Sequence, residues 1–294
     1  MRIKQLQSFI SVIEKGSIRA AARAIGVSQP VVTKSIRVLE RDLGAPLFDR
    51  ISSGARLSRF GEAFAPRARL LLSEMQRALD EIEQLRNESA GHVSVGITTS
   101  VAMTILPRAY STLREQLPGS EIDITEDILP VLLRELLNGT FDFVVAELGS
   151  ALVDPRLHCL DLFEVEVLIC AKRSNPLLRA RSLQDLFDAE WLVPSMGPAE
   201  DVVSLFAAHG MPAPRRIVQG RSVTIALSLV AQSDMIAAFV APIVRSASPH
   251  HDIGIIRVRE PLMPARMCVI SREGETLTPI AERFLDRLAA AHGA

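Results

Sequence analysis

The 294-residue sequence has few cysteines and no long apolar run. Its three cysteines, Cys159, Cys170 and Cys268, lie far apart along the chain and form no Cys-x-x-Cys pair, so no disulfide framework is indicated. No run of 18 or more apolar residues occurs, which argues against a membrane span. The N-terminus lacks the apolar segment and cleavage site of a signal peptide, so we expect a cytoplasmic protein.

Common catalytic motifs are also absent. The sequence contains no GxGxxG, GxxxxGK[ST], GxSxG or HExxH pattern. We therefore predict neither an enzyme nor a protein with a cofactor or a metal ion. The pair His250-His251 stands beside Asp252 in a polar segment, and we favour a solvated loop there over a metal site.

The cysteines do not favour a redox sensor. Cys170 and Cys268 fall inside apolar strand patterns and are expected to be small buried side chains. Cys159 is expected near the junction between the two α/β lobes that the second half of the chain is expected to form. A peroxide-sensing pair needs an accessible thiol of low pKa beside a resolving partner, and the sequence shows no electropositive setting for one.

The net charge is only −1, but the charges are unevenly distributed. Residues 1–70 contain 13 Lys and Arg against 5 Asp and Glu, a balance of +8, whereas the remainder has a balance of −9. Because the screening length is about 8 Å at physiological salt, a bound polyanion would sense mainly the nearby basic region. This region has the charge expected of a DNA-binding unit.

The segment Ser28–Leu43 is predicted to be a helix. Ser28 suits the N-cap, Pro30 suits the first turn, and Gly44 suits the C-terminal stop. One face of this helix is apolar, formed by Val32, Ile36, Leu39 and Leu43. Its other face carries the side chains that we predict to contact bases and phosphates, namely Gln29, Thr33, Lys34 and Arg37. Ser28 and Pro30 lie beside them and belong to the same predicted DNA-binding surface.

A short helix, Ile18–Ile25, precedes it and is separated by the turn Gly26-Val27. A further helix, from about Ile3 to Glu14, would supply the core beneath both. This order predicts a helix-turn-helix whose second helix enters the major groove. The alternative is an ordinary αα-hairpin without a ligand.

A β-hairpin wing is predicted from Leu47 to Leu57. Arg50 and Arg56 would flank it and reach phosphates or a narrow minor groove. The alternative is a solvated turn with two incidental arginines. Next to a helix-turn-helix we favour the wing.

A long helix is predicted from Ser58 to about Asn87, with Pro66 bending or delaying its first turns. Its apolar residues alternate three and four apart, as in an a/d seam: Ala68, Leu71, Met75, Ala78, Ile82 and Leu85. We infer a helix that pairs two subunits. The alternative is that the seam packs against the second half of the same chain.

From His92 onward, short apolar strands alternate with helices, which is typical of parallel α/β units. In such sheets ligands bind beyond the carboxyl ends of strands. The loop Thr98-Thr99-Ser100 follows one strand, and its hydroxyl and N–H groups suit an anion, although simple helix capping is an equal alternative. Arg221 could pair with an acidic effector or be a surface charge.

The stretches AARAIGVSQPVVTKSIRVLERDLGAPLFDR (21–50) and RLSRFGEAF (56–64) resemble the N-terminal domain of LysR-type transcriptional regulators. The resemblance is close over about the first 90 residues, and the remaining length fits the family's effector domain. It implies an α+β multidomain protein with a winged helix-turn-helix (1–58), a linker helix and hinge (59–91) and a two-lobed, periplasmic-binding-protein-like α/β domain (92–294). The first lobe would comprise about 92–161 and 265–294, and the second about 162–264, joined by strands crossing near Asp161 and Pro264.

The resemblance further implies a regulator that binds double-stranded promoter DNA as a dimer, usually doubled into a tetramer. A small anionic effector, such as an organic acid, a sulfonate or a sugar acid, would bind between the lobes. The expected contacts are Thr98, Thr99, Ser100, Glu147, Ser195, Met196, Gly197, Arg221, Phe239 and Val240. Two other classes remain alternatives: a ligand receptor with a vestigial DNA-binding unit, and an enzyme with an appended one.

Overall fold

The computed structural model describes residues 1–49, 55–86, 91–148, 154–194, 200–220, 222–247 and 252–291. The chain divides into two compact units, residues 1–86 with 137–140 and residues 87–136 with 141–294. In the described ranges no helix has both the length and the apolar character that a membrane crossing requires. Several residues singled out above lie outside these ranges: Arg50, Ser195, Met196, Gly197, Arg221, His250 and His251.

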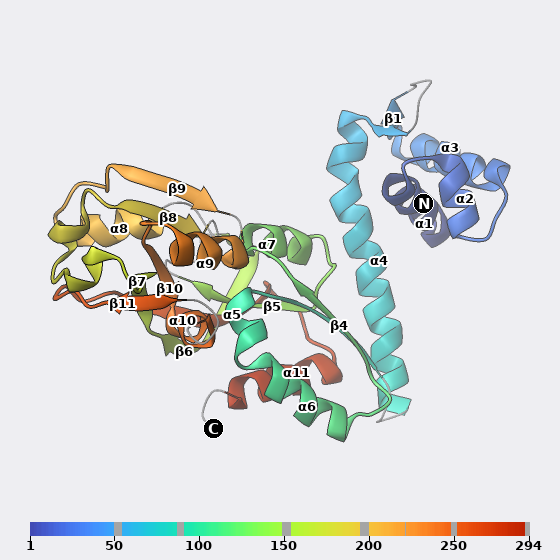
Figure 1. The fold of residues 1–294 in the computed structure, drawn as a ribbon. Helices are drawn as coiled ribbons and strands as arrows, with labels where there is room; N and C mark the ends of the chain where they lie inside the picture. Colours follow the sequence, from blue (N-terminus) through green and yellow to red (C-terminus); the bar gives the residue numbers. More distant parts are fainter. Residues whose placement is uncertain are drawn as a thin grey trace. The chain divides into compact units, whose positions relative to one another are not determined.

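The first unit is a three-helix cluster followed by a small hairpin and a long helix (Figure 1). Its elements are α1 (Ile3–Lys15), α2 (Ile18–Ala24), α3 (Gln29–Leu43), β1 (Phe48–Asp49), β2 (Arg56–Leu57) and α4 (Arg59–Arg86). Phe9, Leu39 and Leu47 are fully buried where α1, α3 and the segment before β1 meet. Gly44 has a φ of 68° and ends α3, which confirms the predicted stop.

The predicted hairpin is confirmed by the antiparallel pairs Phe48–Leu57 and Asp49–Arg56. Glu40, on α3, connects the hairpin to that helix. Its Oε1 accepts hydrogen bonds from the backbone N–H of Leu47 at 2.8 Å and of Phe48 at 3.4 Å. One carboxylate therefore fixes the start of β1 to the end of α3.

The predicted delay at Pro66 is wrong, because α4 begins at Arg59 and continues through Pro66 as one 28-residue helix. Proline removes the N–H that would bond to the carbonyl of Glu62. Pro66 and Glu62 are both exposed, so water can bond to this carbonyl. The helix therefore tolerates the proline at its exposed position.

The second unit consists of two α/β lobes. Its elements are β3 (His92–Ile97), α5 (Thr99–Met103), α6 (Leu106–Gln116), β4 (Glu121–Glu126), α7 (Leu129–Leu137), β5 (Phe143–Leu148), β6 (Leu157–Val165), β7 (Val167–Lys172), η1 (Pro176–Arg179), η2 (Leu183–Leu186), β8 (Glu190–Pro194), α8 (Glu200–Ala208), β9 (Arg216–Gly220), α9 (Val223–Gln232), β10 (Ala237–Val240), α10 (Ala241–Ala247), β11 (Ile253–Ile256), β12 (Ala265–Arg272) and α11 (Pro279–Ala290).

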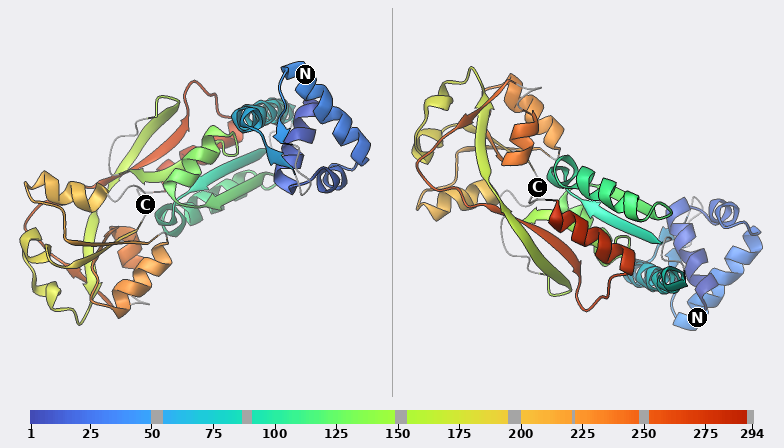
Figure 2. Two further views of the ribbon diagram at one scale, coloured as in Figure 1. Left: turned by 90° about the horizontal axis from the view of Figure 1, so that it is seen from above. Right: turned by 90° about the horizontal axis from the view of Figure 1, so that it is seen from below.

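The first lobe is built on a sheet of order β4-β3-β5-β12-β6. β3 is parallel to β4 and β5, whereas β12 is antiparallel to β5 and β6. Helices α6 and α11 lie side by side in this lobe (Figure 2). The chain thus returns to its first sheet at the end, as the resemblance implied.

The second lobe contains the sheet β10-β7-β11 and the pair β8-β9. A bridge between Trp191 and Ile236 joins β8 to the strand region before β10. Residues 157–172 form two strands, β6 and β7, which are separated at Glu166. β6 pairs with β12 in the first lobe and β7 with β10 and β11 in the second, so Glu166 is where the chain changes sheets.

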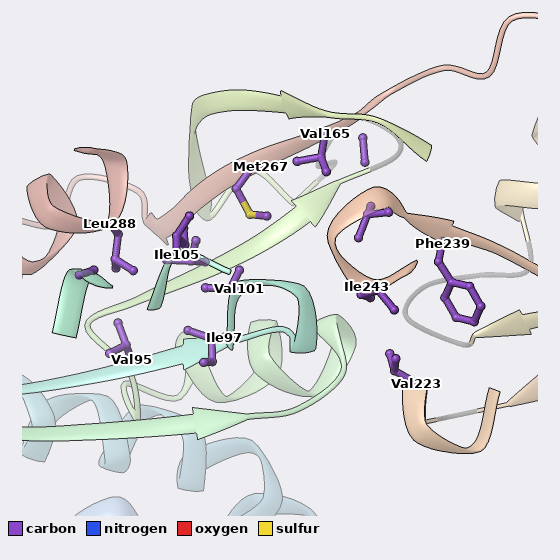
Figure 3. Packing of buried hydrophobic residues seen from close by; sticks show 14 of the residues in the cluster. Val95, Ile97, Val101, Ile105, Val165, Val223, Phe239, Ile243, Met267 and Leu288 are labelled. Carbon is purple, nitrogen blue, oxygen red and sulfur yellow. The ribbon is translucent and has the colours of Figure 1, made fainter. Parts of the chain in front are cut away.

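One apolar core extends through both lobes (Figure 3). Val95, Ile97 and Met267 contribute to it from the first lobe, and Val223 and Phe239 from the second. All five side chains are nearly inaccessible to solvent. The core fixes the carboxyl ends of β3, β4 and β5 relative to the start of α9, and a pocket described below is found there.

Candidate functional site

The predicted contact face of α3 lines a surface hollow of about 660 Å³. It brings together Gln29, Pro30, Thr33, Lys34 and Arg37, and adds two residues that the sequence reasoning missed, Val38 and Arg41. Three of the seven side chains are basic, and none is acidic. The face opposite to this hollow is buried through Val32, Ile36 and Leu39. The amphipathic pattern of α3 therefore produces an exposed basic face on a fixed helix.

Ser28 occupies the N-cap position but does not cap with its side chain. An N-cap hydroxyl normally accepts from the N–H of the second or third helical residue. Here the second residue is Pro30, which has no N–H, and the third is Val31, whose N–H bonds to the carbonyl of Ser28 at 3.0 Å. A Ser28→Ala substitution is therefore not expected to remove a capping hydrogen bond from α3. The exposed hydroxyl is available to a partner outside the helix.

Two further residues bear on this face. Arg56 is exposed on β2, opposite Asp49 in the ladder. Val31, in the first turn of α3, is apolar but 49% exposed. Its side chain is therefore not part of the core. The sequence reasoning missed Val31 because it looked only for polar contacts, whereas apolar side chains can contact thymine methyl groups in the major groove.

In the second unit, the hydroxyls of Thr98, Thr99 and Ser100 all donate to carboxylates. Thr98 and Ser100 bond to Oε2 of Glu147 at 2.5 and 2.6 Å. Thr99 bonds to Oε1 of Glu126 at 2.6 Å. Because β3 lies between β4 and β5, the loop after β3 has Glu126 on one side and Glu147 on the other.

This arrangement gives no support to the predicted anion at Thr98-Thr99-Ser100. The three hydroxyl protons point to carboxylate oxygens, and the following helix α5 has only five residues, so its dipole is small. Simple side-chain capping is also excluded, since Thr98 at the N-cap makes no such bond. The surroundings of the loop are acidic instead.

A pocket of about 120 Å³ lies between the lobes at this edge. Thr99 lines it together with residues that follow β4 and residues that begin α9: Glu126, Asp127, Ile128, Ser222, Val223 and Thr224. Of the predicted contacts, Thr99 alone among the described residues lines the pocket; Thr98, Ser100 and Glu147 adjoin Thr99. Phe239 and Val240 are in the apolar core, 4% and 7% exposed, and do not line the pocket.

The sequence reasoning missed Glu126 and Asp127. A signal was present, since the strand EIDITED ends in two acidic residues at its carboxyl end, where ligands bind in such sheets. Ser222 was also detectable as the N-cap of α9, where its hydroxyl accepts from the N–H of Ile225 at 3.5 Å.

The structure brings Cys159 and Cys268 together across β6 and β12, contrary to their distance in sequence. Their sulfurs and a carboxylate oxygen of Asp161 lie within 4.8 Å of one another. Burial raises the pKa of both thiols, and burial also raises the pKa of Cys170 to about 12. The guanidinium of Arg266 bonds to both oxygens of Asp161 at 2.9 and 2.8 Å. Protonated thiols beside a carboxylate already paired with arginine are poor nucleophiles.

Two family models together match nearly the whole chain. Residues 3–62 match the model described as "Bacterial regulatory helix-turn-helix protein, lysR family". Residues 86–293 match the model described as "LysR substrate binding domain". The first match contains the basic hollow on α3, and the second contains the pocket between the lobes.

Several similar proteins are transcriptional regulators. HTH-type transcriptional regulator GbpR of Azospirillum brasilense is 28% identical, with 99% of this chain and 86% of that protein covered. HTH-type transcriptional regulator PcaQ of Agrobacterium fabrum is 33% identical, with 72% and 70% covered. Full-length CbnR in complex with its target DNA is 26% identical, with a TM-score of 0.70 over 99% of this chain and 100% of that one.

These matches cover both units and confirm the resemblance found in the sequence. They also confirm the expectation of a regulator rather than an enzyme, because the family and these relatives are transcriptional regulators. The chain belongs to the LysR family of DNA-binding transcriptional regulators, with an N-terminal helix-turn-helix and a C-terminal effector-binding domain.

Proposed function

We propose that this regulator binds promoter DNA as a dimer, with α3 in the major groove. The observation that carries the proposal is the hollow on α3, where Lys34, Arg37 and Arg41 surround Gln29 and Thr33. Arginine and lysine neutralise phosphates and bond to guanine, and glutamine bonds to adenine. Ser28 and Val31 add a free hydroxyl and an apolar contact at the same end of the helix. Arg50 and Arg56 of the wing would reach the neighbouring backbone or minor groove.

Arg37→Ala should weaken DNA binding and lower its salt dependence. Each phosphate contact contributes about −0.9 to the slope of log affinity against log salt concentration. If Arg37 binds phosphate, the slope should fall by about 1 and the loss should be similar on all sequences. The measurement is a fluorescence-anisotropy titration on operator and random duplexes between 50 and 200 mM salt.

Lys15→Ala is the matched control, because it removes an exposed charge outside the hollow. It should leave the slope within experimental error. An Arg37→Ala loss confined to the operator would indicate base recognition in place of phosphate binding. An unchanged affinity on both duplexes would contradict the assignment of this face to DNA.

The pairing surface that we propose is the seam of α4. Leu71, Ile82 and Leu85 are 49%, 58% and 70% exposed in the single chain. Leu79, beside the seam, is 57% exposed. A row of exposed apolar side chains along a 28-residue helix supports its burial against a second copy. A tetramer would then be two such dimers, as is usual in the family.

The effector site that we propose is the pocket between the lobes. It is lined from both sheets, so a molecule bound there contacts Thr99 and Glu126 in one lobe and Ser222 and Thr224 in the other. A ligand that binds one lobe arrangement better than another shifts the population toward it. This differential binding is what would change the position of the paired helices on DNA.

A footprint of the full-length protein on DNA upstream of its own and neighbouring genes tests the proposal. We expect two protected half-sites, because paired α4 helices present two copies of α3. A compound that shortens or shifts the protected region is an effector. Absence of protection at low salt, where phosphate contacts are strongest, would refute the DNA-binding proposal.

A further inference from the structure

We propose that the effector is a small neutral polyhydroxylated compound, which donates hydrogen bonds to Glu126 and Asp127 and accepts them from the start of α9. This inference rests on the proposed role of the pocket as the effector site. The ligand that we propose differs from the anion expected from the sequence, because it carries hydroxyl groups and no negative charge.

The first step concerns the acidic side of the pocket. Glu126 and Asp127 line it, and Glu147 holds the adjoining hydroxyls of Thr98 and Ser100. Oε1 of Glu126 accepts from Thr99, and Oδ1 of Asp127 accepts from the N–H of Ile128 at 2.7 Å. The second oxygen of each carboxylate has no hydrogen-bond donor among the described residues. These two oxygens require donors from a ligand or from water, and they repel a carboxylate, sulfonate or phosphate.

The second step concerns the opposite side of the pocket. Val223 and Thr224 belong to the first turn of α9, where backbone N–H groups have no acceptor within the helix. Ser222 uses its hydroxyl to accept from Ile225, so it does not serve these two N–H groups. The start of a ten-residue helix therefore offers donors and a partial positive charge to the pocket.

The two sides together select the class of compound. A hydroxyl group is both a donor and an acceptor, so one hydroxyl can satisfy a carboxylate and an N–H group together. An ammonium group has only donors and would be repelled by the helix end, whereas a carboxylate has only acceptors and would be repelled by Glu126 and Asp127. The pocket is small, about 120 Å³, which suits a small polyol or one end of a sugar.

The test compares compounds with the same carbon skeleton and different charge. Full-length protein is titrated calorimetrically with three- to six-carbon polyols and aldoses, each beside its carboxylate and amino analogues. Glycerol, glycerate and 2-amino-1,3-propanediol form one set, and glucose, gluconate and glucosamine another. We expect at least one neutral compound to bind at least tenfold more tightly than both of its charged analogues and to alter the footprint.

Glu126→Gln probes the carboxylate directly. It should weaken binding of the neutral compound about tenfold, because a charge-assisted hydrogen bond becomes a neutral one. Glu121→Gln is the matched control, since Glu121 is exposed at the other end of the same strand β4 and lies outside the pocket. The control should leave the dissociation constant unchanged. The control should also keep the DNA affinity of the parent protein without effector, and both variants should keep its circular-dichroism spectrum, which shows that they fold.

Three results would overturn the inference. One is tighter binding of any charged analogue than of its neutral counterpart, and another is the absence of millimolar binding by every neutral compound. The third is an unchanged affinity in Glu126→Gln. If a carboxylate binds, alters the footprint and loses both effects in Arg221→Ala, the effector is an anion. The proposed function would then stand, because the footprint tests DNA binding and effector response separately.

Discussion

Replacing Ile82 and Leu85 together by aspartate should convert the protein to a monomer and weaken operator binding at least a hundredfold. Each side chain contributes roughly 1.5–3 kcal/mol when fully buried, and a dimer buries two copies of each. Four charged groups in an apolar seam would also repel one another. A loss of about 4 kcal/mol corresponds to a thousandfold weaker dimer, and a monomer contacts only one half-site at a time.

Sedimentation equilibrium measures the dimer, and anisotropy on two-half-site DNA measures the operator affinity. Glu83→Ala is the control, because Glu83 is exposed on the same helix between the two seam residues and is not part of the seam. It should remain dimeric. If the double variant also remains dimeric, another surface pairs the subunits and the exposed seam of α4 has a different occupant.

Gly61→Ala should destabilise the DNA-binding unit by about 3 kcal/mol, at the upper end of what overpacking usually costs. A Cβ atom at this position would lie 2.1 Å from the carbonyl oxygen of Leu47 and 2.8 Å from a methyl group of Leu57. The carbonyl oxygen cannot move freely, because it accepts from the N–H of Ser58 at 3.0 Å. The first turn of α4 must therefore separate from the hairpin, which also displaces the wing.

Urea unfolding and DNA binding of the same sample provide the measurement. Gly220→Ala is the matched control, because its Cβ would meet only an ordinary contact with Leu192 at 3.5 Å. That variant should unfold within about 1 kcal/mol of the parent protein. Equal stability of the two variants would show that the close approach between α4 and the segment before β1 can relax without cost.

The DNA-binding unit was predictable because its signals are local. The apolar stripe of α3, the glycine stop at Gly44 and the hairpin all follow from residues within a few turns of each other. The error at Ser28 was also local: the capping rule holds for a typical first turn, and Pro30 removes one of the two usual donors. The residue type alone does not show that the N–H of Val31 already donates to the carbonyl of Ser28.

The pocket between the lobes was only half predictable, since the residues that line or adjoin it are distant in sequence. Thr98 lies 49 positions from Glu147, and Thr99 lies 27 positions from Glu126. The sequence shows three hydroxyl residues after a strand. Hydroxyl groups donate equally well to a bound anion and to carboxylates of the protein itself. The neighbouring strands decide which of the two is present, and their order β4-β3-β5 is not contained in any local pattern. The same holds for Cys159 and Cys268, which only strand pairing brings together.

The carboxylate of Glu40 ties the start of β1 to α3 through two hydrogen bonds. With the contacts proposed above, one subunit would span a fixed length of the duplex, from the bases at Gln29 to the groove at Arg56. Inserting one base pair, about 3.4 Å and a tenth of a turn of B-DNA, would put one of the two contacts out of phase. Operators for this regulator should therefore tolerate base changes between the two contacts far better than changes in their spacing.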